Sequence, residues 1–177
     1  MLITVRRLAA DEWRMYRELR LRALADSPDA YGSTHAREAA RPDVDWEDWV
    51  RAGATSDAHL PVVALSGTTP VGLAWARRDE HNPSLAHLFQ VWVAPMHRGR
   101  GVGRLLTHAV ISWARTLGLR TLRLGVTASH PAAMQLYRHV GFVNVGEPES
   151  LRPGSSVLCQ PMQLELSAAI PDPERAG

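Results

Sequence analysis

The chain has 177 residues, of which 45% are hydrophobic and 21% charged, an ordinary composition for a globular protein large enough to bury a core. Its 20 basic residues, all arginine, nearly balance 18 acidic ones, and the net charge of +2 does not predict nucleic-acid binding. A single cysteine, Cys159, excludes an intrachain disulfide, and no apolar run reaches the roughly 18 residues of a membrane helix, so a reducing cytoplasm is expected.

The first half of the chain predicts a strand, two helices and a hairpin. Apolar residues at helical spacing follow Asp11, a residue that can cap a helix. Two later apolar runs are joined by a short turn that contains Gly67 and Pro70, which is typical of a β-hairpin. In chain order we expect a strand at 2–8, a helix at 11–25, a loop through 34, a helix at 45–52, and strands at 61–65 and 71–76.

The second half alternates strands and helices. Residues 85–93 are apolar on both faces, as in a central strand, and Gly118 is a natural end for the helix that follows. The pattern predicts an α/β fold with a mixed, mostly antiparallel sheet of about six to seven strands and about four helices. The remaining expected elements are a helix from 102 to 117, strands at 121–126, 141–143 and 157–166, a helix at 131–140, and a flexible tail at 167–177.

A glycine-rich turn just after the central strand is the most informative stretch. Gly99, Gly101 and Gly103 stand at alternate positions, and apolar residues then resume at helical spacing. Glycines let backbone N–H groups approach a ligand closely, and the first turn of a helix has N–H groups without intrahelical partners. The stretch therefore predicts a site for an anion, most often a phosphate.

Three phosphate-binding patterns can be compared with this turn. A Walker loop ends in Gly-Lys-Ser/Thr, and the chain contains no lysine. A dinucleotide fingerprint has the spacing Gly-x-Gly-x-x-Gly, which differs from the spacing here. The segment Arg98-Gly99-Arg100-Gly101-Val102-Gly103 fits Arg/Gln-x-x-Gly-x-Gly and so resembles the acetyl-CoA pyrophosphate loop of the GNAT N-acetyltransferase superfamily. An RGG-like nucleic-acid segment or a plain glycine turn stays open as an alternative.

A second segment supports the same resemblance. The family's second block reads Asn-x-x-Ala-x-x-Leu-Tyr-x-x-x-Gly-Phe, and residues 130–142 match it everywhere except at the first position, where His130 replaces asparagine. Both blocks occur in the family's order, and the resemblance covers roughly residues 60–166. It implies a single GNAT-like domain over residues 1–166 and a bacterial acyltransferase with acetyl-CoA as its cosubstrate.

The resemblance also implies a role for particular residues. The pantetheine arm of acetyl-CoA would pair with backbone groups of Val91 and Val93, which are otherwise ordinary strand residues. Tyr137 aligns with the tyrosine that faces the leaving thiolate, and a phenol with a pKa of about 10 can donate a proton at neutral pH. The alternative for Tyr137 is a packing role. The full cofactor-binding set is Val91, Val93, Arg98, Gly99, Arg100, Gly101, Val102, Gly103, Arg104, His130 and Tyr137.

The general base is a separate question. Many relatives have a glutamate early in the central strand, and His87 stands at that position here. An imidazole with an unperturbed pKa of about 6.5 can accept the amine's proton. The alternatives are that His87 is a buried, hydrogen-bonded histidine, or that Asp79 or Glu80 serves. His130 is either a cofactor contact or a helix-start residue. The eight histidines show no metal-ligand spacing, so no metal is expected.

The expected function is transfer of an acetyl group from acetyl-CoA to a primary amine of a small molecule or peptide. Carboxylates and aromatic residues in the N-terminal half suggest a cationic acceptor, although the same carboxylates also favour a helix N-terminus. The expected partners are that acceptor and, as an open option, a second copy of the chain, but neither a nucleic acid nor a membrane. The alternative function is an acyl-CoA-binding protein of the same fold with weak or no turnover.

Overall fold

The computed structural model describes residues 2–166 and contains one sheet of eight strands, in the order β1–β2–β3–β4–β5–β8–β6, with β7 paired to β8. Every neighbouring pair is antiparallel except β4 and β5. The expected mixed α/β sheet is confirmed, with β7 as one short strand more than predicted. The expected tail lies outside the described residues. The strands are β1 (Ile3–Arg7), β2 (His59–Ser66), β3 (Thr69–Arg78), β4 (Leu85–Val93), β5 (Thr121–Thr127), β6 (Val143–Asn144), β7 (Glu149–Ser150) and β8 (Leu158–Glu165).

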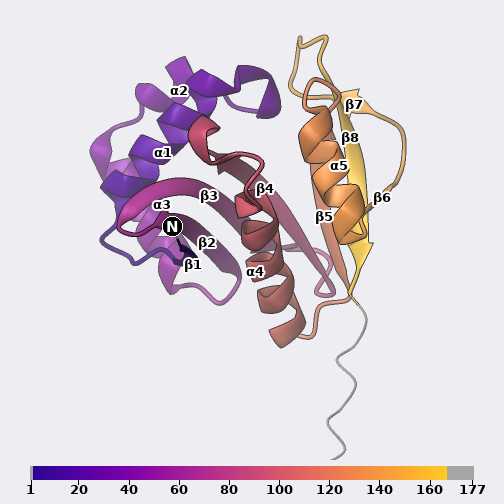
Figure 1. Cartoon of the computed structure of the whole chain (residues 1–177), viewed down its shortest axis with the longest axis horizontal. Coiled ribbons are helices and arrows are strands. Elements are labelled where there is room, and N and C mark those ends of the chain that lie inside the picture. Colours follow the sequence, from indigo (N-terminus) through magenta and orange to yellow (C-terminus); the bar gives the residue numbers. More distant parts are fainter. Residues whose placement is uncertain (1, 167–177) are drawn as a thin grey trace, which may run out of the picture.

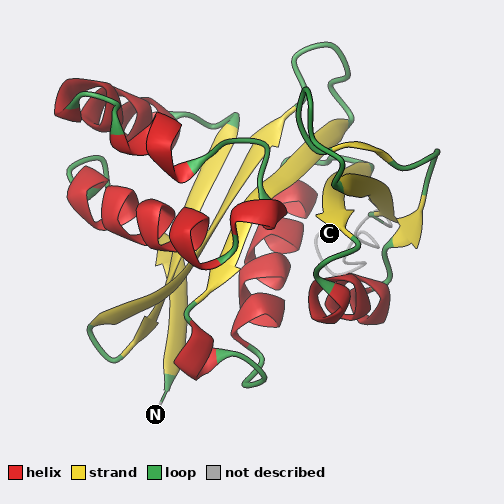
Figure 2. Cartoon of the chain, turned by 90° about the horizontal axis from the view of Figure 1, so that it is seen from above, coloured by secondary structure: helices red, strands yellow, loops and turns green. Residues whose placement is uncertain are grey.

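Helices cover both faces of this sheet (Figure 2). Helices α1 and α3 pack on one face, and α4 packs on the other face against β1 to β4. Helix α5 contacts β5 and α4. No helix among the described residues is long and apolar enough to cross a bilayer. The helices are α1 (Trp13–Asp26), α2 (His35–Ala39), α3 (Asp43–Thr55), α4 (Val102–Thr116) and α5 (Pro131–Val140), with 3₁₀ turns η1 (Pro28–Ala30) and η2 (Pro95–His97).

One expectation about the N-terminal helices was wrong, and one short helix was not expected. Asp11 does not cap α1, because Glu12 occupies the cap position, and the Glu12 carboxylate instead accepts hydrogen bonds from Arg6 and from the Ala9 amide. Residues 35–44, for which no element was expected, contain α2, whose cap residue Thr34 accepts a hydrogen bond from the Arg37 amide. With five residues, α2 is too short to show helical periodicity in the sequence.

Strands β4 and β5 separate after a short common stretch. They pair only at residues 85–87 and 121–123, although β4 continues to Val93 and β5 to Thr127. Figure 1 shows the two strands diverging from their shared end, with α4 in front of β4 and α5 in front of β5. The second half of β4 therefore borders a gap in the sheet rather than a neighbouring strand.

A β-bulge lies in the part of β4 that borders this gap. Leu73 pairs with Trp92 and Trp75 pairs with Phe89, so β4 has one residue more than β3 between these positions. Within the bulge, Gln90 has a φ of 58°, which is left-handed and unusual for a residue with a side chain. A bulge bends its strand and redirects side chains, and here it does so at the start of the gap.

The core on the α1 and α3 side is centred on Trp75. The Trp75 ring is fully buried and lies 5.2 Å from Tyr16 and 5.4 Å from Trp49, measured between ring centroids. Helix α3 approaches this ring closely at Gly53, where an added Cβ would lie 2.2 Å from the Trp75 ring. The close packing of α1 and α3 on β3 gives a firm support to the bulged strand next to it.

Candidate active site

The glycine-rich turn forms a cluster of unpaired backbone donors. Gly99 and Gly101 have φ values of 71° and 81°, which glycine adopts without strain, and Gly101 is the N-cap of α4. Within the part of the chain that the structure describes, the N–H groups from Gly99 to Arg104 have no hydrogen-bond partner. Six consecutive free donors at the N-terminus of a 15-residue helix make a strong anion site.

Packing between α4 and α5 also explains the glycine at position 103. It lies in the first turn of α4, and a Cβ there would come within 3.0 Å of the Leu136 side chain on α5. Val102 is buried, so only its backbone faces the anion site. The third glycine of the motif thus allows α4 and α5 to approach each other, while its N–H remains part of the donor cluster.

Arg98 fastens the turn to the rest of the protein. Its Nε donates to the Val93 carbonyl at 2.9 Å, and its guanidinium pairs with Asp26 at the end of α1. Asp26 also accepts a hydrogen bond from Trp92 Nε1 at 2.9 Å. Burial alone would raise the pKa of Asp26, but the hydrogen bonds from Trp92, Ser27 and Arg98 outweigh it and lower the pKa. Arg98 therefore holds the turn in place, whereas Arg100 and Arg104 are exposed and make no ion pair among the residues described.

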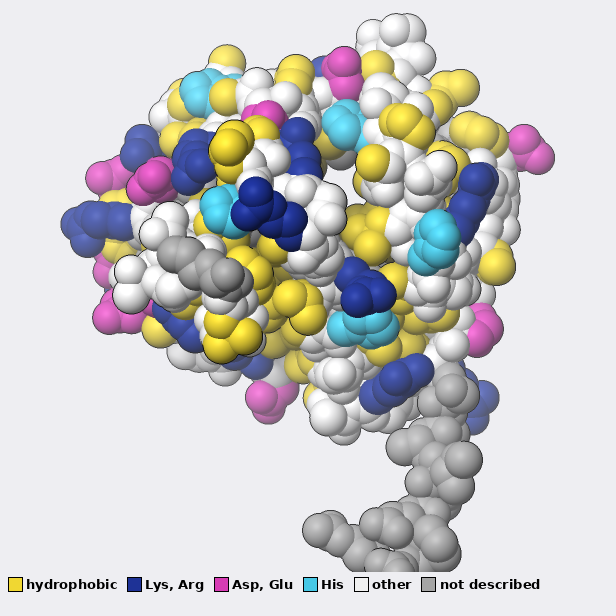
Figure 3. Space-filling model, in the orientation of Figure 1, with side chains coloured by type: hydrophobic (Ala, Val, Ile, Leu, Met, Phe, Trp, Pro, Cys, Tyr) yellow, Lys and Arg dark blue, Asp and Glu magenta, His cyan; other side chains and the backbone are white. Residues whose placement is uncertain are grey.

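The gap between β4 and β5 runs from the last paired residue, His87, to the end of β4 at Val93, and this turn follows that end. Figure 3 shows a hollow between the surface over α4 and the surface over α5, with hydrophobic side chains deep inside it. Val91 and Val93 lie on the part of β4 without a β5 partner. The Val91 carbonyl accepts a hydrogen bond from the Tyr31 hydroxyl at 3.1 Å, and the Val93 carbonyl is bonded to Arg98. Both carbonyls are thus occupied by side chains, which the sequence did not indicate.

Tyr137 lies on α5 and is buried, with its ring packed edge-on against Phe142 at 5.7 Å. Burial raises the pKa of the Tyr137 hydroxyl, and the nearby Tyr31 raises it further. The hydroxyl makes no hydrogen bond with another described residue, and its oxygen is not among the fully enclosed atoms that lack a partner. It is therefore a neutral donor without a partner of its own.

His130 occupies the N-cap position of α5, and its imidazole is tied to its own turn. Nδ1 lies 2.9 Å from the Thr127 hydroxyl and 3.1 Å from the Ser129 hydroxyl. The imidazole makes no capping hydrogen bond to α5, and its Nε2 has no hydrogen-bond partner among the described residues.

His87 is paired with a carboxylate. Its Nε2 lies 2.8 Å from Asp79 Oδ2, and Asp79 also accepts hydrogen bonds from the His81 and Asn82 amides. The hydrogen bond from His87, followed by those from the two amides, lowers the pKa of Asp79 to about 2. The pair lies at the end of β4 that is still joined to β5, three residues before the bulge. In the sequence, His87 and Asp79 are alternative candidates for the general base, and the structure joins them in one hydrogen-bonded pair.

A cavity of about 250 Å³ opens on the other side of the bulge. Phe89 and Gln90 of β4 form its floor, and Gln90 Oε1 accepts a hydrogen bond from the Tyr16 hydroxyl at 2.5 Å. Helices α1, α2 and α3 supply the walls. The sequence did not reveal this cavity, because four elements and a bulge assemble it. The complete lining is Tyr16, Ser33, Arg37, Glu38, Arg41, Trp49, Phe89 and Gln90.

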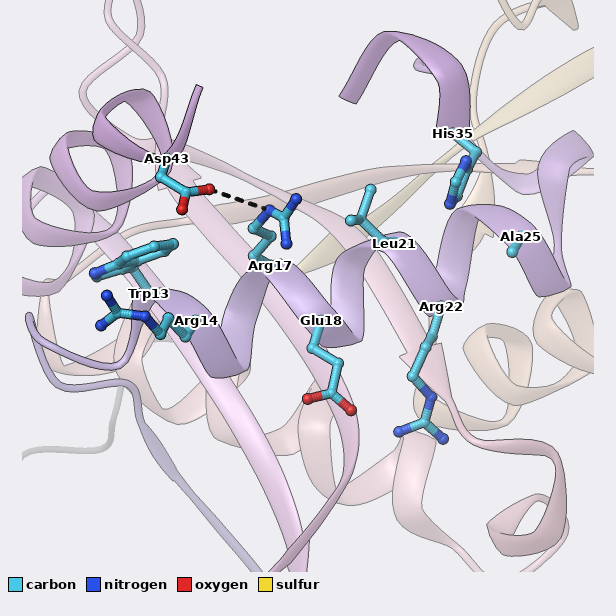
Figure 4. A pocket seen from close by; sticks show the side chains of 9 residues that line it. All are labelled: Trp13, Arg14, Arg17, Glu18, Leu21, Arg22, Ala25, His35 and Asp43. Carbon is cyan, nitrogen blue, oxygen red and sulfur yellow. Dashed lines mark ion pairs between the residues drawn. The ribbon is translucent and has the colours of Figure 1, made fainter. Parts of the chain in front are cut away.

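A larger hollow of about 480 Å³ lies on the outer side of α1 (Figure 4). Arg14, Arg17 and Glu18 border it, and Arg17 points toward Asp43 across it. It contains none of the predicted site residues, and no lining residue comes from the bulged strand or from the glycine-rich turn. This hollow is separate from the gap and from the cavity beside Gln90.

Comparisons with known proteins agree with this geometry. The model of the acetyltransferase (GNAT) family matches residues 11–142. A mycothiol acetyltransferase of Pseudarthrobacter chlorophenolicus is 32% identical over 123 residues, which is 68% of this chain and 36% of that protein. A streptothricin acetyltransferase of Streptomyces lavendulae is 32% identical over 130 residues, 73% of this chain and 61% of that protein. The chain thus spans less than two thirds of either relative.

Solved structures show the same fold. A putative acetyltransferase from Salmonella typhimurium, determined with its cofactor acetyl-CoA, has a TM-score of 0.77 at 21% identity. The match covers 98% of this chain and 99% of that one. The family match over residues 11–142, together with the split sheet and the glycine-rich turn, leads to one conclusion: the chain belongs to the GNAT acetyltransferase family.

Proposed function

We propose that this protein transfers an acetyl group from acetyl-CoA to a primary amine of a small molecule or peptide. The observation that carries the proposal is the run of six free N–H groups at residues 99–104, placed at the opening of the gap in the sheet. A pyrophosphate matches these donors in charge and geometry. The related mycothiol and streptothricin acetyltransferases support the same reaction class.

The two sides of the bulge suit the two substrates. The gap that holds Val91, Val93 and Tyr137 would take the pantetheine arm, and the cavity beside Phe89 and Gln90 would take the amine. Acetyl-CoA supplies an activated acyl group and a thiolate leaving group. We assign the proton for that thiolate to the Tyr137 hydroxyl, whose pKa is raised by burial and by the nearby Tyr31, so that it stays protonated.

The amine must lose a proton to react, and the His87–Asp79 dyad is our proposed acceptor for it. Asp79 stays ionised at any neutral or mildly acidic pH, because its pKa is about 2, and it can stabilise a protonated imidazole. His87 does not line the amine cavity, so the proton would travel through water. We expect kcat/KM to rise with pH in the wild type and the rise to be lost in His87→Ala. An unchanged profile would remove His87 from this role.

The test of the proposal is release of free CoA from acetyl-CoA with a panel of amines, followed by identification of the acetylated product. Polyamines, amino acids, short peptides and aminoglycosides cover the main classes of primary amine. Acetylation of any of them would support the proposal. Tight acetyl-CoA binding without CoA release would instead favour an acyl-CoA-binding protein. The contacts of His130 motivate this second arm of the test, because its Nδ1 is bonded to the hydroxyls of Thr127 and Ser129 in its own turn.

A further inference from the structure

The charges around the amine cavity differ from those the sequence suggested. The expected cationic acceptor depended on carboxylates near the aromatic residues of the N-terminal half. Glu47 and Asp48 instead pair with Arg51 on the exposed side of α3, and none of the three lines the cavity. Asp79 is bonded to His87. The carboxylates that suggested a cationic acceptor therefore do not line the cavity, although Trp49 does.

The one carboxylate in the cavity wall is already neutralised. Glu38 is buried, and both its oxygens accept hydrogen bonds from Arg20, at 2.7 and 3.0 Å. The Arg20 side chain is only 3% exposed and also lies over the Tyr31 ring. Each carboxylate oxygen of Glu38 accepts one of these hydrogen bonds, and the ion pair anchors α2 on α1. Glu38 therefore gives the cavity little negative charge.

Two arginines in the same wall have no such partner. Arg37 and Arg41 flank Glu38, and among the described residues neither guanidinium makes a hydrogen bond or an ion pair. Arg41 is held in position by the Trp46 ring, 4.9 Å from its guanidinium carbon. The Gln90 amide adds a donor, because its oxygen is already bonded to Tyr16. The polar groups that remain for a ligand are thus mainly donors, two of them positively charged.

We propose that the acceptor is an amine that carries a carboxylate, as an amino acid does, and that Arg37 and Arg41 bind this carboxylate. The inference rests on the proposed amine acetylation and specifies its substrate class. A guanidinium matches a carboxylate in charge and can bind it with two parallel hydrogen bonds. The aromatic walls formed by Trp49 and Phe89 suit an apolar side chain. A cavity of about 250 Å³ is slightly smaller than the range of roughly 300–1,000 Å³ for drug-sized ligands, which favours a compact acceptor.

The experiment compares amines that differ only at the carboxylate. L-Phenylalanine, its amide and phenethylamine form one series, and L-methionine, its amide and 3-(methylthio)propylamine form another. Binding is titrated in the presence of CoA, which does not react, and turnover is measured separately with acetyl-CoA. We expect the free carboxylate to bind at least tenfold more tightly than the amide or the decarboxylated amine, as a charge-assisted hydrogen bond allows.

Variants of the two arginines make the test specific. Arg37→Gln and Arg41→Gln should each reduce the advantage of the carboxylate roughly tenfold, with little effect on binding of the amide. Arg51→Gln is the matched control, because Arg51 lies outside the cavity and should leave the advantage unchanged. Arg37 is exposed and its side chain has no partner among the described residues, so Arg37→Gln decides the test if Arg41→Gln does not fold.

The outcomes separate this inference from the proposed function. Carboxylates that bind no better than amides, or an advantage that survives in both arginine variants, would overturn the inference, even if other amines are acetylated. Arginine-dependent binding of carboxylates without CoA release would support the inference and refute the acetyltransferase proposal for this chain.

Discussion

At the scale of single residues, the Arg20–Glu38 ion pair connects stability with the amine cavity. Burying two charges is favourable only when they bind each other well, and removal of one partner leaves the other uncompensated. Here the pair is bidentate and nearly inaccessible to water. Its position between α1 and α2 means that the short helix α2 depends on it; α2 carries Arg37, and Arg41 follows two residues after its end.

We expect Glu38→Gln to lower the free energy of unfolding by about 3–5 kcal/mol at pH 7, because Arg20 stays buried without its counterion. Burial raises the pKa of Glu38, but hydrogen bonds from Arg20 outweigh this and lower it. The contribution of the pair is therefore complete above the unfolded-state pKa of about 4.3, and it is lost as the pH falls through the lower folded-state pKa. Urea titrations at pH 7 and pH 3.5 measure both effects.

Glu47→Gln is the control for this prediction. Glu47 pairs with Arg51 on the surface, where loss of an ion pair costs less than about 1 kcal/mol. Equal losses in the two variants, or a Glu38→Gln deficit that grows in acid, would contradict the account.

Tyr137→Phe tests the proposed proton donor. The hydroxyl has no partner among the residues described, so its removal should leave the free energy of unfolding nearly unchanged. If it protonates the thiolate, kcat should fall by about a hundredfold, with little change in the affinity for acetyl-CoA. Single-turnover kinetics separate this step from product release. An unaltered single-turnover rate would return Tyr137 to a packing role.

At the scale of elements, the sequence predicted the glycine-rich turn and its neighbours well. The bounds of β4 and α5 agree with expectation because long apolar runs and terminal signals such as Pro131 and Gly141 define them. Helix α2 and strand β7 were not predicted, because five and two residues are too few to show a helical or an alternating pattern of apolar residues. The cavity was not predicted for the same reason, since the sequence assigned no element to residues 35–44, which include Arg37 and Arg41.

Gly101→Val tests the turn. A left-handed residue with a branched side chain is strained by about 1–2 kcal/mol, and the side chain would also stand where a pyrophosphate meets the N–H groups. We expect the affinity for acetyl-CoA to fall at least tenfold, the equivalent of one charge-assisted hydrogen bond. Isothermal titration calorimetry on the folded variant gives the value.

Gly118→Val is a matched control for backbone strain. Gly118 has a φ of 68° just beyond the other end of α4, and an added Cβ there meets nothing within 4 Å. Both variants should lose similar stability, but Gly118→Val should bind acetyl-CoA like the wild type. A comparable loss of affinity in both would show that strain, rather than the turn, governs binding.

At the scale of the whole molecule, the sheet consists of two parts joined by a narrow connection. Residues 85–87 and 121–123 form the only β4–β5 pairing, and Arg152, in the turn after β7, donates to the carbonyls of Pro28 and Tyr31 from across the gap. The sequence indicated the strands but not their separation, because the bulge at Gln90 contains no glycine to mark it. A bulge depends on pairing with β3, which is a tertiary feature.

A ligand that occupies the gap should therefore hold the two parts together. At a concentration of 100 times its Kd, acetyl-CoA should stabilise the fold by about 2.7 kcal/mol. For a chain of this size each kcal/mol raises Tm by about 2–4 °C, so the expected rise is about 5–10 °C, measurable by calorimetry.

When acetyl-CoA binds, hydrogen exchange should slow at the free amides of residues 99–104 and at the gap-facing end of β4. Pantetheine alone, which lacks the pyrophosphate, should protect β4 but leave residues 99–104 exchanging at the rate of the free protein. Protection of residues 99–104 by pantetheine, or a rise in Tm with acetyl-CoA without slower exchange at those residues, would place the cofactor elsewhere.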